Sequence, residues 1–435
     1  MKKTIITSVF AFMLSSFTVL SLAATEFSGD LLSKPHRAFE IGINTNTSLS
    51  NNTFGLEDIL VKEIKIDLQK MVSDMPDSGF DLALLNKEKV YIDLNASSRF
   101  RFSFFTDLES SMHFNISKDF FSILGSGISV DKEKNIDISL CADSFFDIGT
   151  SFQTIIKGYG VKITPTYFVP LFYVPNTSFK SSYLSKSNGE ITFNAKADVD
   201  IYTAIDMEGY IDNGDKHSDF DIGEVLSNGG FDFSFEIERN WLHGLNAGLY
   251  TRIPMVAGKL NYRMTTTAYA SFHEENLMDF ITDSNKKLED VKSGHVKPST
   301  YNDKHENEEE GYDFYQDSFK AYRPLKLGLN ATYMPWGNWL KIQPSLGFAV
   351  RNPYTQYAKF YPEYSLDLNL SLLASFLGFQ FGTAYQSQVY QHRFGMSLNI
   401  HAVELVAQVS MCGTSFISTF HTVGYGAFAG VRIGI

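Results

Sequence analysis

The sequence predicts an all-β fold, a transmembrane antiparallel β-barrel of about 14 strands within a range of about 12–16. Three observations predict it: an export signal at the N-terminus, no later apolar stretch of helix-spanning length, and long segments in which apolar and polar residues alternate. The chain has 435 residues, of which 44% are hydrophobic. Its mean hydropathy of -0.11 is too polar for a bundle of membrane helices. We therefore expect one barrel domain over residues 24–435.

The N-terminus has the layout of a bacterial secretory signal. Lys2 and Lys3 precede an apolar run over residues 4–19, and Ala23 ends a small-residue cleavage motif. We expect residues 1–23 to be removed and the mature chain to reside in the bacterial outer membrane. A retained single anchor is the alternative, but the apolar core is short for one. The absence of cysteine near this site excludes a lipoprotein.

Alternation of apolar and polar side chains is clearest over residues 190–205. There Phe193, Ala195 and Val199 share one face, while Lys196 and Asp198 share the other. A soluble β-sandwich would show the same alternation, and an exported protein of that kind is the alternative. Strand length and charges in mid-strand favour a barrel with a wet interior. Similar alternation recurs over residues 92–104, 231–238, 325–333, 366–373 and 403–412.

The expected linkers alternate between long and tight, as in outer-membrane barrels with short periplasmic turns and long external loops. The longest one, 274–319, is expected to be extracellular. Its mixed charges suit either a solvated loop or a surface that contacts a ligand or a host. Upstream, segments 38–46 and 107–117 are the least regular strands, which leaves about fourteen or about sixteen strands in total.

A helical period replaces the strand period over residues 56–75. Apolar residues recur there at three- and four-residue spacing, and Pro76 and Gly79 follow as stop signals. This amphipathic helix is expected to be a plug inside the barrel, or else a cap on its surface. Its candidate ligand or gating residues are Leu60, Ile64, Leu68 and Met71.

Two further residue pairs are candidates for function. Arg99 and Arg101 share a face and would bind an anionic head group or balance lumenal acids. Pro165 and Pro170 interrupt the strand expected at 152–172, and proline cannot donate to a ladder, so a gap in the wall is expected there. Cys141 and Cys412 both have lumenal parity, and one disulfide between them is possible in an oxidising compartment.

Composition and motifs exclude several classes of function. The net charge of -12 argues against a nucleic-acid partner, and two cysteines cannot form a multi-cysteine metal site. The sequence has no GxSxG, HExxH, Walker A or GxGxxG motif in its expected context. We therefore expect no enzyme, no cofactor and no metal, although an outer-membrane hydrolase stays a remote alternative.

The last strand has a recognisable pattern. In Phe428–Ile435, glycine stands sixth from the end and apolar residues stand third from the end and last. This resembles the targeting signal of bacterial outer-membrane proteins, which implies the barrel-assembly machinery as a partner. The sequence departs from that signal at Ile435, where phenylalanine is commonest, and at Phe428, where a polar residue is usual.

With the segments Arg37–Ile43 and Leu49–Asn52, this ending resembles an uncharacterised family of spirochaete outer-membrane barrels. That family is distantly similar to the long-chain fatty-acid transporters, whose Asn-Pro-Ala element is replaced here by Asn51-Asn52-Thr53. The resemblance implies passive uptake of a small hydrophobic or amphipathic molecule across the lipid bilayer through a plugged barrel. The alternative is a structural or adhesive surface protein that acts through its loops.

Overall fold

The computed structural model describes residues 31–32, 37–53, 68–97, 99–127, 129–206, 222–274, 313–373, 375–414, 416, 418–420 and 424–435. The expected signal peptide, Leu60, Ile64 and most of the 274–319 loop lie outside these ranges. Within them, no helix is long and apolar enough to cross a membrane.

Strands make up most of the described chain. Their bounds are β1 Phe39–Asn51, β2 Phe80–Leu94, β3 Phe100–Ile116, β4 Lys134–Ile156, β5 Tyr159–Ser185, β6 Ile191–Thr203, β7 Gly230–Leu242, β8 Leu245–Val256, β9 Gly258–Glu274, β10 Asp313–Ala321, β11 Leu325–Tyr333, β12 Leu340–Arg351, β13 Lys359–Leu372, β14 Leu377–Gln386, β15 Val389–Ile400, β16 Val403–Gly413 and β17 Tyr425–Gly434. The helices are α3 Leu68–Asp74, α4 Lys118–Ser126 and α6 Ile222–Ser227, with single turns at Gly337–Trp339 and Ser418–Phe420.

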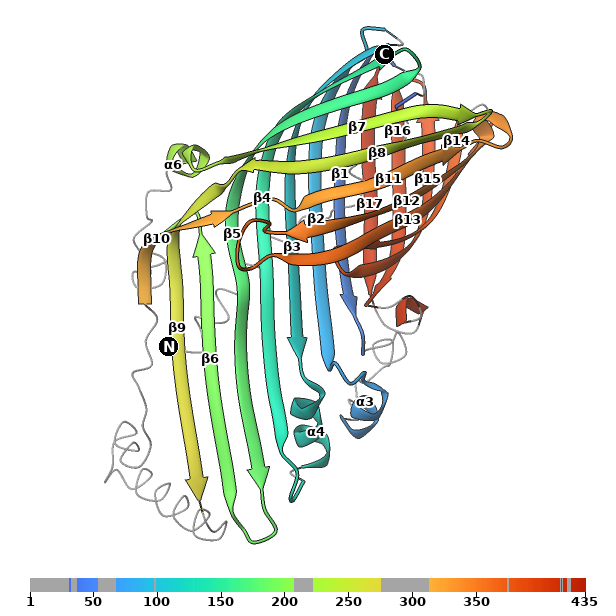
Figure 1. The fold of residues 1–435 in the computed structure, drawn as a ribbon. Coiled ribbons are helices and arrows are strands. Elements are labelled where there is room, and N and C mark those ends of the chain that lie inside the picture. Colours follow the sequence, from blue (N-terminus) through green and yellow to red (C-terminus); the bar gives the residue numbers. More distant parts are fainter. Residues whose placement is uncertain are drawn as a thin grey trace.

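The strands form one closed antiparallel barrel (Figure 1). Closure occurs at β1, which pairs with β2 on one side and with the last strand, β17, on the other. Closing the sheet removes nearly all of the exposed edges that a membrane would not tolerate. Among the described strands, β10 alone pairs on one side only, with β9. The predicted fold class, an antiparallel β-barrel, is confirmed.

The number of strands differs from the predicted number because three wall strands are each broken in two. β6 and β7 both pair with β5, opposite residues 172–185 and 159–168 respectively. β8 and β9 are separated by one residue, and β10 and β11 by three. The sheet therefore contains seventeen strands, while the ring of pairings passes through fourteen positions.

The break in the wall is centred on Pro170. Here β5 changes neighbours: Phe168 pairs with Gly230 of β7, whereas Phe172 pairs with Thr203 of β6. The proline has no N–H to donate, and the register between β4 and β5 shifts beside it. Its ring fills the space that a side chain on Gly258 would need, so β9 can pass close to β5 at this point.

An apolar belt covers the outside of the barrel. Exposed residues such as Ile43, Ile92 and Phe102 alternate along their strands with less exposed residues such as Asn44, Tyr91 and Arg101. Exposed apolar surface on this scale requires lipid. At one end Trp336 stacks on Trp339, with ring centroids 5.1 Å apart, as in the aromatic girdle of a membrane barrel.

The two ends of the barrel differ as the linker lengths predicted. The tight turns β2–β3, β4–β5, β7–β8 and β15–β16 lie at the end that holds the C-terminus (Figure 1). The opposite end carries the longer connections, with α3 and α4, and there β4, β5, β6 and β9 extend beyond the other strands. The predicted 274–319 loop was too long at its C-terminal side, since β10 begins at Asp313.

Candidate functional site: a lumen closed by its own wall

The hairpin between β14 and β15 crosses the wide end of the lumen. Val389, 1% exposed, packs against Ala83 of β2 and Cys412 of β16. The ring nitrogen Nε2 of His113 on β3 lies 2.9 Å from the carbonyl oxygen of Ser387 at the hairpin tip. Because β15 and β2 are four positions apart around the ring, these contacts place the hairpin across part of the lumen.

This hairpin separates two polar cavities. The outer one, of about 300 Å³, is lined by residues that include Asp81, His113, Asn115, Lys359 and Gln388. The inner one, of about 80 Å³, lies between the hairpin residues Gln386 and Ser387 and the charged side chains in the middle of the lumen.

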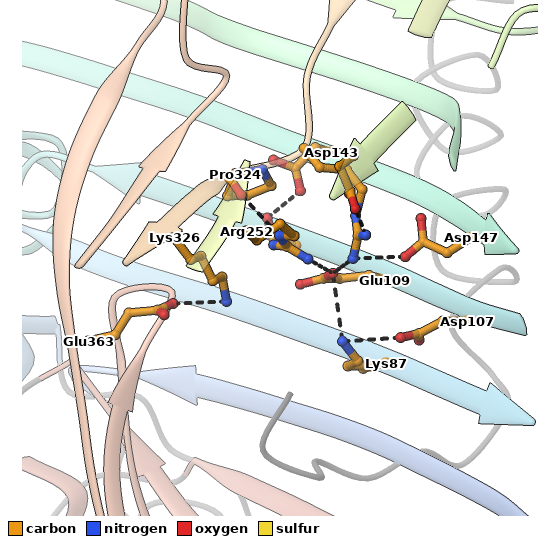
Figure 2. A network of polar contacts seen from close by, with 12 residues as sticks. Lys87, Asp107, Glu109, Asp143, Asp147, Arg252, Pro324, Lys326 and Glu363 are labelled. Carbon is orange, nitrogen blue, oxygen red and sulfur yellow. Dashed lines mark hydrogen bonds and ion pairs between the residues drawn. The ribbon is translucent and has the colours of Figure 1, made fainter. Parts of the chain in front are cut away.

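A network of buried ion pairs forms the floor of the inner cavity (Figure 2). Arg323, at the break between β10 and β11, lies 2.7 Å from Asp232, 2.8 Å from Asp147 and 3.0 Å from Glu109. Its side chain is 4% exposed, and those of Asp147 and Asp232 are 0% exposed. Arg252 also approaches Glu109, at 3.6 Å. These side chains join strands up to five positions apart around the ring, so they block the lumen.

The remaining ion pairs of the network hold the adjoining walls. Lys87 lies 3.1 Å from Asp107 and 3.8 Å from Glu109. Lys326 of β11 lies 3.3 Å from Glu363 of β13, and only β12 separates these two strands. Buried charges of this kind are tolerated because each has a partner.

A third closure involves the N-terminal stretch. The amide of the buried Leu31 donates to Glu238 Oε2 at 2.5 Å, and Gln153 Nε2 donates to the Leu31 carbonyl at 2.7 Å. Six residues later, Arg37 donates to the His401 carbonyl at 2.8 Å and pairs with Glu40. The two contacts lie on different parts of the wall at the short-turn end.

The described part of the predicted plug helix lies elsewhere. Leu68 begins α3 and Met71 lies within it, and the helix packs against α4 at the rim, beyond the strand ends (Figure 1). Gln69 donates to the Gly125 carbonyl at 3.3 Å, and Lys118 donates to the Met75 carbonyl at 2.7 Å. Over residues 68–75, the expectation of a helix inside the barrel is therefore corrected to a helix on its rim.

The other predicted residues are not gathered at one place. Arg99 is exposed in the β2–β3 turn, whereas Arg101 is half-buried on β3 opposite Gln153. Pro165 pairs with Phe233 inside the β5–β7 ladder, and Pro170 lies at the wall break. Cys141 and Cys412 are both free thiols, with no disulfide between them.

An apolar cluster that the sequence analysis missed surrounds the wall break. Phe145, Phe168, Tyr173 and Leu260 are buried in it, and Val225 of α6 packs into it. Phe319 of β10 stacks on Tyr202 and Tyr173, with ring centroids 4.1 and 5.1 Å apart. The charged floor was also missed, although its acids and bases share lumenal parity along their strands and could have been identified from that.

The fold and the apolar belt define a transmembrane β-barrel protein. No family model matches the chain, and no curated protein matches it either. Among solved structures it is similar to the Pseudomonas putida toluene transporter TodX, at 9% identity over 94% of each chain with a TM-score of 0.40. A Pseudomonas aeruginosa FadL homologue is similar at 8% identity over 91% of this chain and 89% of that one, with a TM-score of 0.39.

The translocator domain of the autotransporter NalP from Neisseria meningitidis is similar at 8% identity over 93% of this chain and 91% of its own. Its TM-score is 0.34. At these identities and scores, the likenesses do not distinguish one family of barrels from another.

Proposed function

We propose that this chain is a bacterial outer-membrane barrel that mediates passive uptake of small hydrophobic or amphipathic molecules. The observation that carries the proposal is the apolar cluster at the wall break, which adjoins a polar lumen through Phe145. A molecule with an apolar part could leave the lumen there, between strands whose ladder is already interrupted at Pro170.

The expected path starts at the wide end, which would face the outside. The ligand would enter the outer cavity, pass the β14–β15 hairpin and leave through the wall or to the periplasm. We also expect cleavage of the signal after Ala23 and recognition of Phe428–Ile435 by the barrel-assembly machinery.

Uptake of a labelled fatty acid into proteoliposomes tests this function. Phe319→Ala would remove the ring that stacks between Tyr173 and Tyr202, so we expect faster uptake. Phe360→Ala on the exposed outer face is the matched control and should leave the rate unchanged. No uptake by the natural chain, or equal rates in both variants, would contradict the proposal.

A surface-binding role is the second candidate. The extension of β4, β5, β6 and β9 beyond the rest of the wall favours it, because it carries the β5–β6 hairpin away from the rest of the barrel (Figure 1). Adhesion of cells that carry the full chain to host matrix, lost on shortening residues 275–312, together with no uptake, would support this role over transport.

A further inference from the structure

We propose that the inner cavity binds a zwitterionic group, either a free small zwitterion or the head group of a zwitterionic amphiphile. This inference goes beyond the proposed function, because it assigns a ligand chemistry to the lumen and holds for a free solute as well as for a lipid-like cargo. It rests on the size of the cavity and on the signs and positions of the charged side chains that line it.

The cavity lies between the β14–β15 hairpin and the charged side chains of the lumen. Its roof is the β14–β15 hairpin at Gln386 and Ser387, and its floor includes Glu109 and Lys87. A water-sized group occupies about 10–15 Å³ on this measure, so about 80 Å³ holds roughly five to eight such groups. That is the size of an amino acid or a trimethylammonium carboxylate without a long chain.

Two ion pairs approach the cavity from different walls (Figure 2). Lys87 and Glu109, 3.8 Å apart, belong to β2 and β3, while Lys326 and Glu363, 3.3 Å apart, belong to β11 and β13. All four side chains line the cavity. A zwitterion between them would offer its cation to a glutamate and its anion to a lysine on either side, which keeps each buried charge compensated.

The charged side chains that line the cavity are of both signs. Lys87 and Lys326 are the cations of the lining, and Glu109, Asp143 and Glu363 are its anions. Beyond the lining, Asp143 pairs with Arg351, Glu109 with Arg323 and Lys87 with Asp107. A zwitterion can interact with lining charges of both signs at once, whereas a simple carboxylate or ammonium ion interacts favourably with one sign only.

The uncharged lining fits the same ligand chemistry. Asn46, Ser111, Gln386 and Gln391 surround the charges with hydrogen-bonding groups. A bare hydrocarbon would have to remove water from these groups without replacing its hydrogen bonds. Phe145, which lines the cavity and also belongs to the apolar cluster, is where the chain of an amphiphile would leave the polar site.

Calorimetric titration of the full chain in nanodiscs tests the site with glycine betaine, and with its two halves, acetate and tetramethylammonium. We expect betaine to bind at least tenfold more tightly than either half. Glu363→Gln should weaken betaine at least tenfold and strengthen acetate, and Lys326→Gln should weaken betaine and strengthen tetramethylammonium. Glu190→Gln, in the exposed pair with Lys186 on the β5–β6 hairpin, is the matched control and should change nothing.

Heat-modifiable migration of every variant establishes that the barrel is folded. Betaine binding that is absent, or that neither cavity substitution alters, would overturn the inference. Uptake of dodecyl betaine and of dodecanoate is then compared in the proteoliposome assay. This comparison distinguishes a free zwitterion from an amphiphile head group as the ligand, and it distinguishes the inference from the proposed function. Equal uptake of both amphiphiles, with no betaine binding, would overturn the inference and leave the proposed function standing. Betaine binding without uptake of any amphiphile would support the inference and overturn the proposed function.

Discussion

Arg323 is the residue on which the closed floor of the lumen depends most. It is the cation that pairs with both Asp147 and Asp232, whose side chains are completely buried. Arg323→Met keeps much of the side-chain volume but leaves these carboxylates without their partner. Breaking a buried ion pair on one side costs about 3–5 kcal/mol, a change in the unfolding equilibrium of roughly a hundredfold to several thousandfold.

The matched control is Arg263→Met. Arg263 pairs with Asp200 at 2.7 Å, a similar distance, but the two side chains are 31% and 30% exposed. Water and salt screen such a pair, and its loss should cost about 0–1 kcal/mol. Urea unfolding in lipid vesicles, followed by the loss of heat-modifiable migration, measures both variants. A further variant that adds Asp147→Asn and Asp232→Asn to Arg323→Met should recover part of the stability, because neutral amides are less costly to bury than unpaired carboxylates.

Conductance in planar bilayers provides a second measurement of the same change. We expect the natural chain to conduct little, because the network crosses the lumen, and Arg323→Met to conduct more. If Arg323→Met lost no more stability than Arg263→Met, and the double asparagine change recovered nothing, the view that these ion pairs hold the floor together would be refuted.

Three further outcomes are expected. Gly42→Ala should destabilise the barrel by about 1–3 kcal/mol in the same urea assay, because the ring of Tyr91 lies where the new methyl group would be; an unchanged midpoint would contradict this. Leu31→Asp should release the N-terminal stretch, since it places a charge at a fully buried site, and limited proteolysis of intact barrels should then cut near residue 31. Val389→Ala should destabilise the barrel by about 2 kcal/mol in the urea assay, because this buried side chain packs in one cluster with Ala83 and Cys412; an unchanged midpoint would contradict this packing.

The barrel itself could be predicted from sequence because its signal is local. The alternation over residues 190–205 extends through β6, Ile191–Thr203, and needs no knowledge of the partner strands. The interruption at Pro170 was also visible, since a missing N–H is a property of the residue itself. The division of strands such as β6 and β7 was not, because it depends on which neighbour β5 meets on each side of the proline.

The closure of the lumen could not be predicted for a related reason. The helical period at 56–75 was interpreted as a plug inside the barrel or as a cap on its surface. That interpretation did not include contacts between opposite parts of the wall. The fold brings Val389 against Ala83 and Arg323 against Glu109, and such contacts between distant strands leave no periodic trace in the sequence. The alternation along each strand placed the charged residues on the lumenal face. It did not show which acid pairs with which base.

The arrangement of these closures bears on the route that a cargo can take. Axial passage would require the β14–β15 hairpin, the Arg323 network and the contacts of Leu31 to open in turn, and the second of these steps exposes or unpairs completely buried charges. Passage through the wall beside Pro170 avoids the contacts of Leu31. It requires the aromatic side chains of the apolar cluster to move apart, and this movement breaks no ion pair. For a cargo with an apolar part, burial of its own surface among Phe145, Phe168 and Phe319 would offset the loss of their contacts with one another, at about 25 cal/mol per Å². A fully polar solute gains nothing there, so we expect this geometry to favour the escape of an amphiphile through the wall over that of a free zwitterion.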